Sequence, residues 1–190
     1  MTSHPAVFLD LQGTLGGDGL GNILDFEFFP WAIPAIQCLN SSGLTAIVAT
    51  NQSQIGRGVL TYAHYLKRVD ELQAILAKNH AHLDAFYYCP HTKDQGCDCC
   101  KPRPGMLLQA QKDFQLDLAT CYVVGDTGAW DILLAKATGS HAVLVRTGLG
   151  ESSLGEYRHT WAGFEADFIA EDVLEAARWV AKSENHIFQV

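Results

Sequence analysis

Short apolar runs alternate with longer amphipathic segments along the whole chain. Near-continuous apolar runs are typical of strands that are buried on both faces of a sheet. The predicted strands are Ala6–Leu11, Thr45–Thr50, Ala85–Cys89, Cys121–Gly125 and Ala142–Arg146. The segments between them carry helix signals, such as Thr61 as a helix N-cap and Pro104 in a first turn. The predicted helices are Ile33–Leu39, Thr61–Asn79, Pro104–Phe114, Ala129–Ala137 and Ala170–Lys182, and the stretches Gly13–Asn22 and Gly148–Gly163 are expected to be loops.

Strands separated by helices of this length predict βαβ crossovers and therefore a parallel sheet. We expect an α/β fold with a central parallel sheet between two helical layers. The chain has 190 residues and 48% hydrophobic residues, enough for one buried core, so residues 1–190 are interpreted as one domain.

Polar side chains follow four of the predicted strands, where ligands gather in open α/β sheets. They are Asp10, the run Thr50-Asn51-Gln52-Ser53, the pair Cys89 and His91, and Asp126. A single strand-end residue of this kind is more often a turn or helix cap. Four such endings favour a functional site over sheet architecture alone.

The residue types indicate phosphoryl chemistry. A carboxylate such as Asp10 can attack phosphorus and form an aspartyl-phosphate. A divalent cation would offset the charge, and Mg²⁺ suits a site with two carboxylates, Asp10 and Asp126. Thr50 could hold phosphate oxygens, and Lys101 could stabilise the transferring phosphoryl group. An isolated lysine would otherwise be interpreted as solvent-exposed.

Charge and hydropathy exclude several classes of partner. A net charge of −8 argues against nucleic-acid binding, which needs a basic face. Apolar runs are too short to span a membrane, and the polar stretch Met1–Pro5 does not resemble a signal peptide. We expect a cytoplasmic monomer that acts on a small phosphorylated substrate.

Four of the six cysteines lie between positions 89 and 100, together with a histidine. In a cytoplasmic chain this clustering favours a bound metal over disulfides. Cys38 and Cys121 are more simply interpreted as small buried apolar residues.

The ordered motifs resemble those of the haloacid-dehalogenase (HAD) phosphatases, subgroup IIIA, which includes heptose-bisphosphate and histidinol phosphatases. The first motif, D-x-D-G-T, corresponds to Asp10–Thr14. The second, T-N-Q-S-G-I-x-R-G, is similar to Thr50–Gly58. The lysine motif, K-P-x-P-G-M, matches Lys101–Met106, and the last acidic motif matches Gly125-Asp126, with Asp131 further on. The similarity runs in order from residue 6 to about residue 180.

The resemblance implies a Rossmann-like fold without a large cap domain. It implies that Asp10 is the nucleophile, that Thr50 and Lys101 stabilise the phosphoryl group, and that Asn51, Gln52 and Ser53 lie among the substrate-binding residues. The Mg²⁺ ligands would be the carboxylates of Asp10 and Asp126 and the backbone carbonyl of Gln12.

The subgroup also carries a zinc loop of the form C-x-H…C-x-C. Here it would comprise residues 89–99, with Cys89, His91, Cys97 and Cys99 as a closed, structural Zn²⁺ site. Cys100 is a competing ligand next to Cys99.

Three positions depart from the family pattern. Gln12 stands where the phosphatases have the aspartate that acts as general acid and then base, and an amide exchanges no proton near neutral pH. Cys100 and Thr127 stand where the heptose-bisphosphate enzymes have Arg and Lys, so two positive charges are missing. The segment 16–22, here called the flap, is short and glycine-rich for a substrate-contacting loop.

The leading hypothesis is a Mg²⁺-dependent phosphatase of a small metabolite, of the sugar-phosphate or histidinol-phosphate type, slowed by Gln12. The alternatives are a phosphotransferase with a longer-lived aspartyl-phosphate, and a catalytically impaired binding or regulatory protein. A zinc-binding interaction module ranks last, because it leaves Asp10, Thr50, Lys101 and Asp126 unexplained.

Overall fold

A parallel six-stranded sheet forms the centre of the molecule. The computed structural model describes residues 5–187. The strands are β1 (Ala6–Leu9), β2 (Thr45–Asn51), β3 (Ala85–Cys89), β4 (Tyr122–Gly125), β5 (His141–Val145) and β6 (Phe168–Ala170). Their order is β3-β2-β1-β4-β5-β6, and every neighbouring pair is parallel. The predicted α/β fold, with a Rossmann-like parallel sheet, is confirmed.

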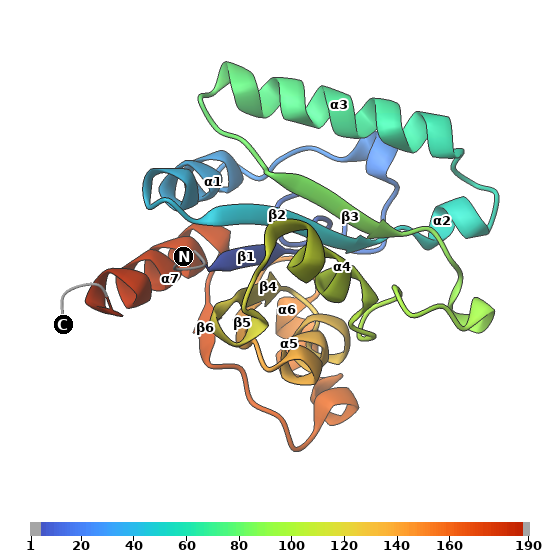
Figure 1. Cartoon of the computed structure of the whole chain (residues 1–190). Helices are drawn as coiled ribbons and strands as arrows, with labels where there is room; N and C mark the ends of the chain where they lie inside the picture. Colours follow the sequence, from blue (N-terminus) through green and yellow to red (C-terminus); the bar gives the residue numbers. More distant parts are fainter. Residues whose placement is uncertain (1–4, 188–190) are drawn as a thin grey trace.

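Helices cover both faces of the sheet (Figure 1). The longer helices are α1 (Ala32–Ser41), α3 (Tyr62–Lys78), α4 (Gly105–Phe114), α5 (Leu133–Thr138) and α7 (Val173–Ile187). Shorter ones are η1 (Ile23–Asp25), α2 (Ser53–Gly56), η2 (Lys93–Gln95), η3 (Leu118–Thr120), the π-helical turn η4 (Gly128–Ile132), α6 (Gly150–Leu154) and η5 (Arg158–Trp161). Among residues 5–187, no helix combines the length and apolarity that crossing a membrane requires.

Alternating side chains of the strands build two hydrophobic layers. Val7 and Leu9 of β1 pack in one layer with α1, α3 and α7. Ala6 and Phe8 of β1 point to the opposite face and pack with α4 and α5. The alternation follows from the two-residue period of a strand, and it explains why the strands read as continuous apolar runs.

The elements near the C-terminus of the chain were predicted less well than the central strands. β6 was missed because it has three residues and lies at the sheet edge, where Ile169 is 41% exposed. The helix predicted from Ala170 begins at Val173 instead, because Ala170 pairs with Val145 of β5. The side chain of Asp172 accepts hydrogen bonds from the backbone N–H groups of the first turn, as an N-cap does.

The loop predicted over Gly148–Gly163 is also wrong in part. This segment contains α6 and η5, and the buried Trp161 fixes it by donating from Nε1 to the carbonyl of Ser153 at 3.0 Å. The helix predicted over Ala129–Ala137 is present, but it opens with the π-helical turn Gly128–Ile132.

The strand order places the functional ends of β1 and β4 side by side. The sequence of connections reverses between these two strands, and ligands bind in α/β sheets where such a reversal opens a crevice. Asp10 follows β1 and Asp126 follows β4. The fold therefore brings together two carboxylates that are 116 positions apart in the chain.

Candidate active site

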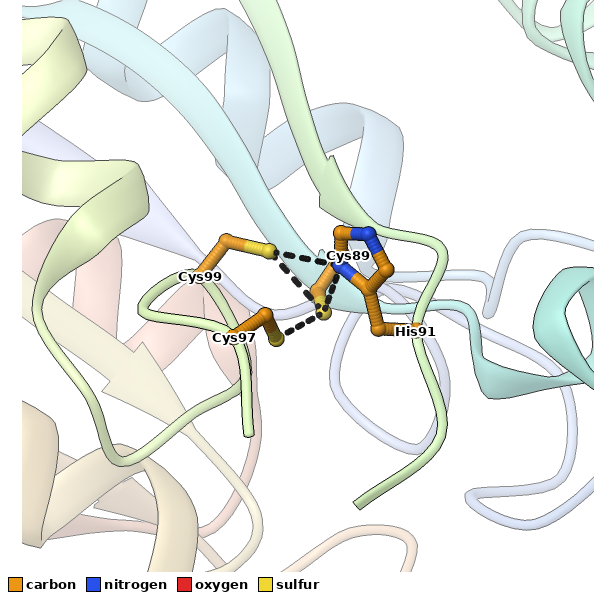
Figure 2. A group of neighbouring side chains, drawn as sticks. All are labelled: Cys89, His91, Cys97 and Cys99. Atoms are coloured by element: carbon orange, nitrogen blue, oxygen red, sulfur yellow. Dashed lines mark hydrogen bonds between the residues drawn. The ribbon is translucent and has the colours of Figure 1, made fainter. Parts of the chain in front are cut away.

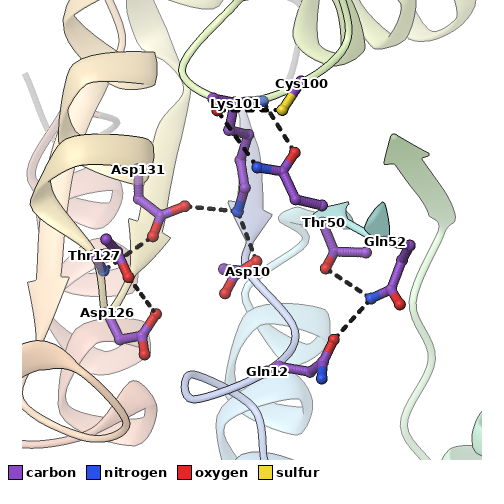
Figure 3. Close-up of polar contacts among 10 residues, drawn as sticks. Asp10, Gln12, Thr50, Gln52, Cys100, Lys101, Asp126, Thr127 and Asp131 are labelled. Carbon is purple, nitrogen blue, oxygen red and sulfur yellow. Dashed lines mark hydrogen bonds and ion pairs between the residues drawn. The ribbon is translucent and has the colours of Figure 1, made fainter. Parts of the chain in front are cut away.

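A buried lysine joins two carboxylates at the carboxyl edge of the sheet (Figure 3). Lys101 Nζ donates to Asp10 Oδ1 at 2.6 Å and to Asp131 Oδ1 at 2.7 Å. The Lys101 and Asp131 side chains are only 2% and 1% exposed, whereas Asp10 is 12% exposed. The lysine engages only one of the two carboxylate oxygens of Asp10, and its charge lies beside the other.

Asp131 holds this lysine, a role that the sequence left open. Its Oδ2 accepts a hydrogen bond from the backbone N–H of Thr127 at 3.1 Å, so both of its oxygens are used. A Cβ on Gly125 would come within 2.1 Å of the Asp131 side chain, so only glycine fits at the end of β4. The spacing Gly125-Asp126…Asp131 was the available signal, but only the π-helical turn between them shows that Asp131 points inward.

The carboxylate of Asp126 lies in a backbone cradle. Its Oδ2 accepts from the N–H of Leu149 at 2.8 Å, and its Oδ1 accepts from the Thr127 hydroxyl at 3.3 Å. Gly13 and Gly148 have positive φ angles of 84° and 56°, and a Cβ on either would lie about 2 Å from Asp126 Oδ2. Glycine is therefore required on both sides of this carboxylate.

Asp10 and Asp126 have raised pKa values. Burial and the neighbouring Asp10 and Asp131 charges raise the pKa of Asp126 to about 8. Burial also raises the pKa of Asp10 to about 6, although Lys101 works in the opposite direction. For Lys101, burial lowers the pKa, but the two aspartates outweigh it and raise the pKa overall.

This donor set fits a hard divalent cation. Asp10, Asp126 and Asp131 each offer a carboxylate oxygen, and these oxygens lie within 4.8 Å of one another. Oxygen donors of this kind are what Mg²⁺ prefers, and a divalent charge would relieve the repulsion that raises the pKa values. Lys101 forms ion pairs with Asp10 and Asp131 and not with Asp126, so Asp126 is the carboxylate of the three that is most available to a cation.

Gln12 is held in a network of amides rather than beside Asp10. Its Oε1 accepts from Gln52 Nε2 at 2.9 Å, and its Nε2 donates to the carbonyl of Gly21 at 2.5 Å. Gln54 Nε2 donates to the same carbonyl at 2.8 Å. Figure 3 shows the Gln12 side chain directed toward Gln52. The amide therefore ties the flap to the end of β2, and a carboxylate, which has no donor, could not do so.

The polar residues at the end of β2 make different contacts. The Thr50 hydroxyl accepts from Gln52 Nε2 at 3.1 Å, which leaves its proton available for an anion. Asn51 pairs with the backbone of Lys101: its Oδ1 accepts from the N–H at 3.0 Å and its Nδ2 donates to the carbonyl at 3.4 Å. Ser53 begins α2. Asn51 thus positions the lysine, and its predicted contact with substrate stays a prediction, as does that of Ser53.

A second cluster lies at the end of β3 (Figure 2). Ligand atoms of Cys89, His91, Cys97 and Cys99 all lie within 4.8 Å of one another. Cys89 Sγ is 3.5 Å from Cys97 Sγ and 3.1 Å from Cys99 Sγ, and His91 Nδ1 is 3.2 Å from Cys99 Sγ. A tetrahedral site with Zn–S bonds of about 2.3 Å separates its sulfurs by roughly 3.8 Å. The four side chains could therefore close around Zn²⁺ with small adjustments.

The thiols of Cys97 and Cys100 have different surroundings. Burial opposes ionisation of Cys97, but a hydrogen bond from Cys89 helps to lower its pKa to about 7, and metal binding requires the thiolate. Cys100 turns away and donates to the carbonyl of Lys101 at 3.7 Å. Of the two candidates for the last position, Cys99 lies in the cluster and Cys100 does not.

Comparison with known proteins gives sequence relatives over most of the chain. The HAD-hydrolase-like family model matches residues 98–176. The D-glycero-beta-D-manno-heptose-1,7-bisphosphate 7-phosphatase of Yersinia pestis is 38% identical over 84% of this chain and 89% of that protein. The protein of the same name from Pasteurella multocida is 41% identical over 75% of this chain and 82% of that protein.

Solved structures of phosphatases are also similar to this chain. A D,D-heptose 1,7-bisphosphate phosphatase from B. bronchiseptica, complexed with magnesium and phosphate, has a TM-score of 0.85 and 30% identity, covering 94% of this chain and 99% of that one. A HAD-like phosphatase from Mesorhizobium loti has a TM-score of 0.74 and 26% identity, covering 95% and 87%. With these relatives, the motifs and the fold, the chain belongs to the HAD-like hydrolases and is a phosphatase of that family.

Proposed function

We propose that this protein is a Mg²⁺-dependent phosphomonoesterase that works through an aspartyl-phosphate at Asp10. The observation that carries the proposal is the Lys101 ammonium, buried between Asp10 and Asp131 at 2.6 and 2.7 Å, with Asp126 beside them. A fixed positive charge next to a carboxylate whose second oxygen is not engaged by the lysine suits attack on a phosphorus atom.

The residues would act in two steps. The oxygen of Asp10 that does not accept from Lys101 forms a bond to phosphorus while the bond from phosphorus to the leaving oxygen breaks. Water then attacks the phosphorus of the aspartyl-phosphate, which releases inorganic phosphate and restores the carboxylate. Lys101 and the Thr50 hydroxyl would hold the phosphoryl oxygens, with Asn51, Gln52 and Ser53 around them.

The Mg²⁺ ligands would be the carboxylates of Asp10 and Asp126 and the backbone carbonyl of Gln12. When bound, the cation supplies positive charge between the nucleophile and the phosphate. The four side chains Cys89, His91, Cys97 and Cys99 would hold Zn²⁺ in a closed site that braces the loop beside the pocket.

The amide of Gln12, in place of an acid/base carboxylate, is the reason to propose slow turnover. The leaving oxygen must take its proton from water, because the amide has none to give, and a missing acid/base typically costs about 10²–10⁴-fold in rate. The same feature favours the second candidate, a phosphotransferase or binding protein in which the aspartyl-phosphate persists.

The proposed substrate is a small phosphorylated metabolite, of the sugar-phosphate or histidinol-phosphate type. Relatives are named for a heptose bisphosphate. The uncharged Cys100 and Thr127 weigh against a substrate with a second phosphate at those positions. We further propose a cytoplasmic monomer.

The test is hydrolysis of an activated aryl phosphate with and without Mg²⁺, by the wild type and by Asp10→Asn. The exposed Asp25, which lies in η1, supplies the matched control Asp25→Asn. We expect Mg²⁺-dependent release of phosphate by the wild type and the control only. Equal rates in the wild type and Asp10→Asn would remove Asp10 as the nucleophile.

A further inference from the structure

Two amide side chains converge on one carbonyl group of the flap. Gln12 Nε2 donates to the carbonyl oxygen of Gly21 at 2.5 Å, and Gln54 Nε2 donates to the same oxygen at 2.8 Å. A carbonyl oxygen has two lone pairs, so both acceptor positions of Gly21 are used. The two glutamines come from the ends of different strands, Gln12 after β1 and Gln54 after β2, and the fold brings them to one atom.

Both glutamines replace residues of the family pattern. Gln12 stands at the second aspartate of D-x-D-G-T, and Gln54 stands at the glycine of T-N-Q-S-G-I-x-R-G. Glycine has no side chain, and an ionised carboxylate has no proton to donate. Neither residue of the pattern could therefore donate to the carbonyl of Gly21. The two departures together supply a contact that the pattern itself does not provide.

Gln54 is attached to a well-anchored part of the chain. It lies in α2, and its backbone carbonyl accepts from the N–H groups of Val59 and Leu60 at 3.0 and 3.1 Å. Its Oε1 is buried and has no partner among the described residues, so Nε2 alone makes the hydrogen bond of this side chain. Gln12 is held in turn by the amide of Gln52. Both donors therefore reach the flap from fixed positions.

The base of the flap is fastened as well. The N–H of Gly17 donates to the carbonyl of Glu27 at 3.0 Å. The guanidinium of Arg68, in α3, donates to the carbonyls of Ile23 and Phe26 in the segment that follows the flap. Hydrogen bonds thus hold the flap at its base and, through the two glutamines, at Gly21.

The tip of the flap lies against the carboxylate of Asp126. A Cβ at Gly19 would lie 3.2 Å from Asp126 Oδ2. Within the flap, the N–H of Gly21 donates to the carbonyl of Asp18 at 2.9 Å, and the N–H of Leu20 donates to the Asp18 carboxylate at 2.9 Å. These turn bonds link the two glycines, so fixing Gly21 also fixes Gly19 beside Asp126.

We propose that Gln54 is a positioning residue that, together with Gln12, holds the flap as a fixed wall over Asp126 before any substrate binds. Gln54 acts through the flap and touches no reacting atom. The pocket then keeps one shape with and without a ligand, and little ordering of the flap is left to occur on binding. The inference deepens the proposed function, because this wall borders the site where the phosphoryl group is proposed to bind.

Hydrogen exchange of the flap amides, measured by mass spectrometry, tests the proposal without requiring catalysis. In the ligand-free wild type, the peptide that spans residues 17–22 should exchange slowly. Gln54→Met and Gln54→Glu both remove the donor, and only the second adds a charge. Each should speed this exchange by about fivefold or more, the factor expected for the loss of one hydrogen bond. Thermal unfolding checks that both variants remain folded.

Gln73→Glu is the matched control. Gln73 Nε2 also donates to a backbone carbonyl, that of Leu83 at 3.0 Å, but this contact lies outside the flap. Exchange of residues 17–22 should stay at the wild-type rate in this variant. In an aryl phosphate assay, Gln54→Met should raise KM more than it lowers kcat, because the loosened flap must then be ordered each time a substrate binds.

Inorganic phosphate with Mg²⁺ separates a fixed wall from a moving lid. Added to the wild type, it should protect residues 17–22 little beyond the ligand-free state. Fast exchange without ligand that slows strongly with phosphate would show a lid and overturn the inference. Wild-type exchange in Gln54→Met, or equally fast exchange in Gln73→Glu, would also overturn it. The expected exchange pattern without hydrolysis of any phosphomonoester would leave the role of Gln54 standing and remove the phosphatase.

Discussion

Among single residues, we propose that Gln12 limits how fast this site turns over. Its amide is bonded at both ends, to Gln52 and to the carbonyl of Gly21, so it serves to hold the flap. It is buried, with 8% of its surface exposed. Relative to the aspartate of the family pattern, we propose that Gln12 replaces a proton donor with hydrogen bonds that hold the flap.

Replacing Gln12 with Asp should return the missing acid/base. We expect Gln12→Asp to raise the rate on an unactivated phosphomonoester by about 10²-fold or more. Gln54→Asp is the matched control, because Gln54 also holds the carbonyl of Gly21 but lies outside the proton path. Steady-state kinetics of both variants separate the two effects. An equal rise in the two would assign the gain to a looser flap instead.

Asp131 is a second residue whose role is indirect. It touches Lys101 and Thr127, and we expect Asp131→Asn to leave the fold intact while removing one of the two charges that raise the lysine pKa. The alkaline limit of the pH–rate profile should then move to lower pH, with a reduced maximal rate. Thermal unfolding of the same sample checks the fold. An unchanged profile would show that Asp10 alone sets the state of the lysine.

At the scale of elements, the loop after β3 is the clearest case for a structural metal. Cys89 ends the strand, His91 and Cys97 flank η2, and Cys99 returns the chain toward Lys101. Holding these together fixes the entry to the segment that carries the lysine.

Cys97→Ser should remove one ligand of four, lower the zinc content of gently purified protein well below one per chain, and lower its melting temperature. Cys100→Ser should change neither, because that thiol faces the carbonyl of Lys101. Elemental analysis with thermal unfolding measures both. Full zinc content in Cys97→Ser, or substoichiometric zinc in the wild type, would contradict the assignment.

Elements with a strong local pattern were predictable, and those fixed by distant contacts were not. The buried strands β1, β2, β4 and β5 are recognisable in the sequence as apolar runs. Thr61 caps α3 as expected, because its side chain accepts a hydrogen bond from the backbone N–H of His64. By contrast, α6 and η5 depend on Trp161 packing under Gly128, which no local pattern encodes.

In the molecule as a whole, the order of the strands places the carboxylates of Asp10 and Asp126 close together. A bound cation would offset their mutual repulsion. Asp10 and Asp126 have raised pKa values of about 6 and about 8 in the folded protein, against an ordinary value of 3.8. The folded state thus binds more protons than the unfolded state between pH 4 and 8, and stability falls as pH rises through this window.

Metal-free protein should therefore melt at progressively lower temperature from pH 5 to pH 8. Mg²⁺ should raise the melting temperature more at pH 8 than at pH 5, because protons compete with the cation at the lower pH. In Asp126→Asn the slope with pH and the effect of Mg²⁺ should both shrink. Differential scanning calorimetry measures this, and a Mg²⁺ effect that is retained in Asp126→Asn would place the cation elsewhere.

The candidate site was predictable as a set of residues but not as an arrangement. Asp10, Thr50, Lys101 and Asp126 stand in recognisable motifs, and the parallel sheet brings them together. The amide network of Gln12 depends on where the flap lies relative to Gln52 and Gln54, more than thirty positions away. Sequence patterns carry no such distances.

Trapping the covalent intermediate would reveal whether Asp10 becomes phosphorylated. The wild type would be mixed with an activated aryl phosphate and Mg²⁺, quenched in acid, digested, and mapped by mass spectrometry. We expect one added phosphoryl group on the peptide that contains Asp10, persisting because Gln12 cannot activate water, and none in Asp10→Asn. A phosphoryl group on another residue, or one retained in Asp10→Asn, would contradict it.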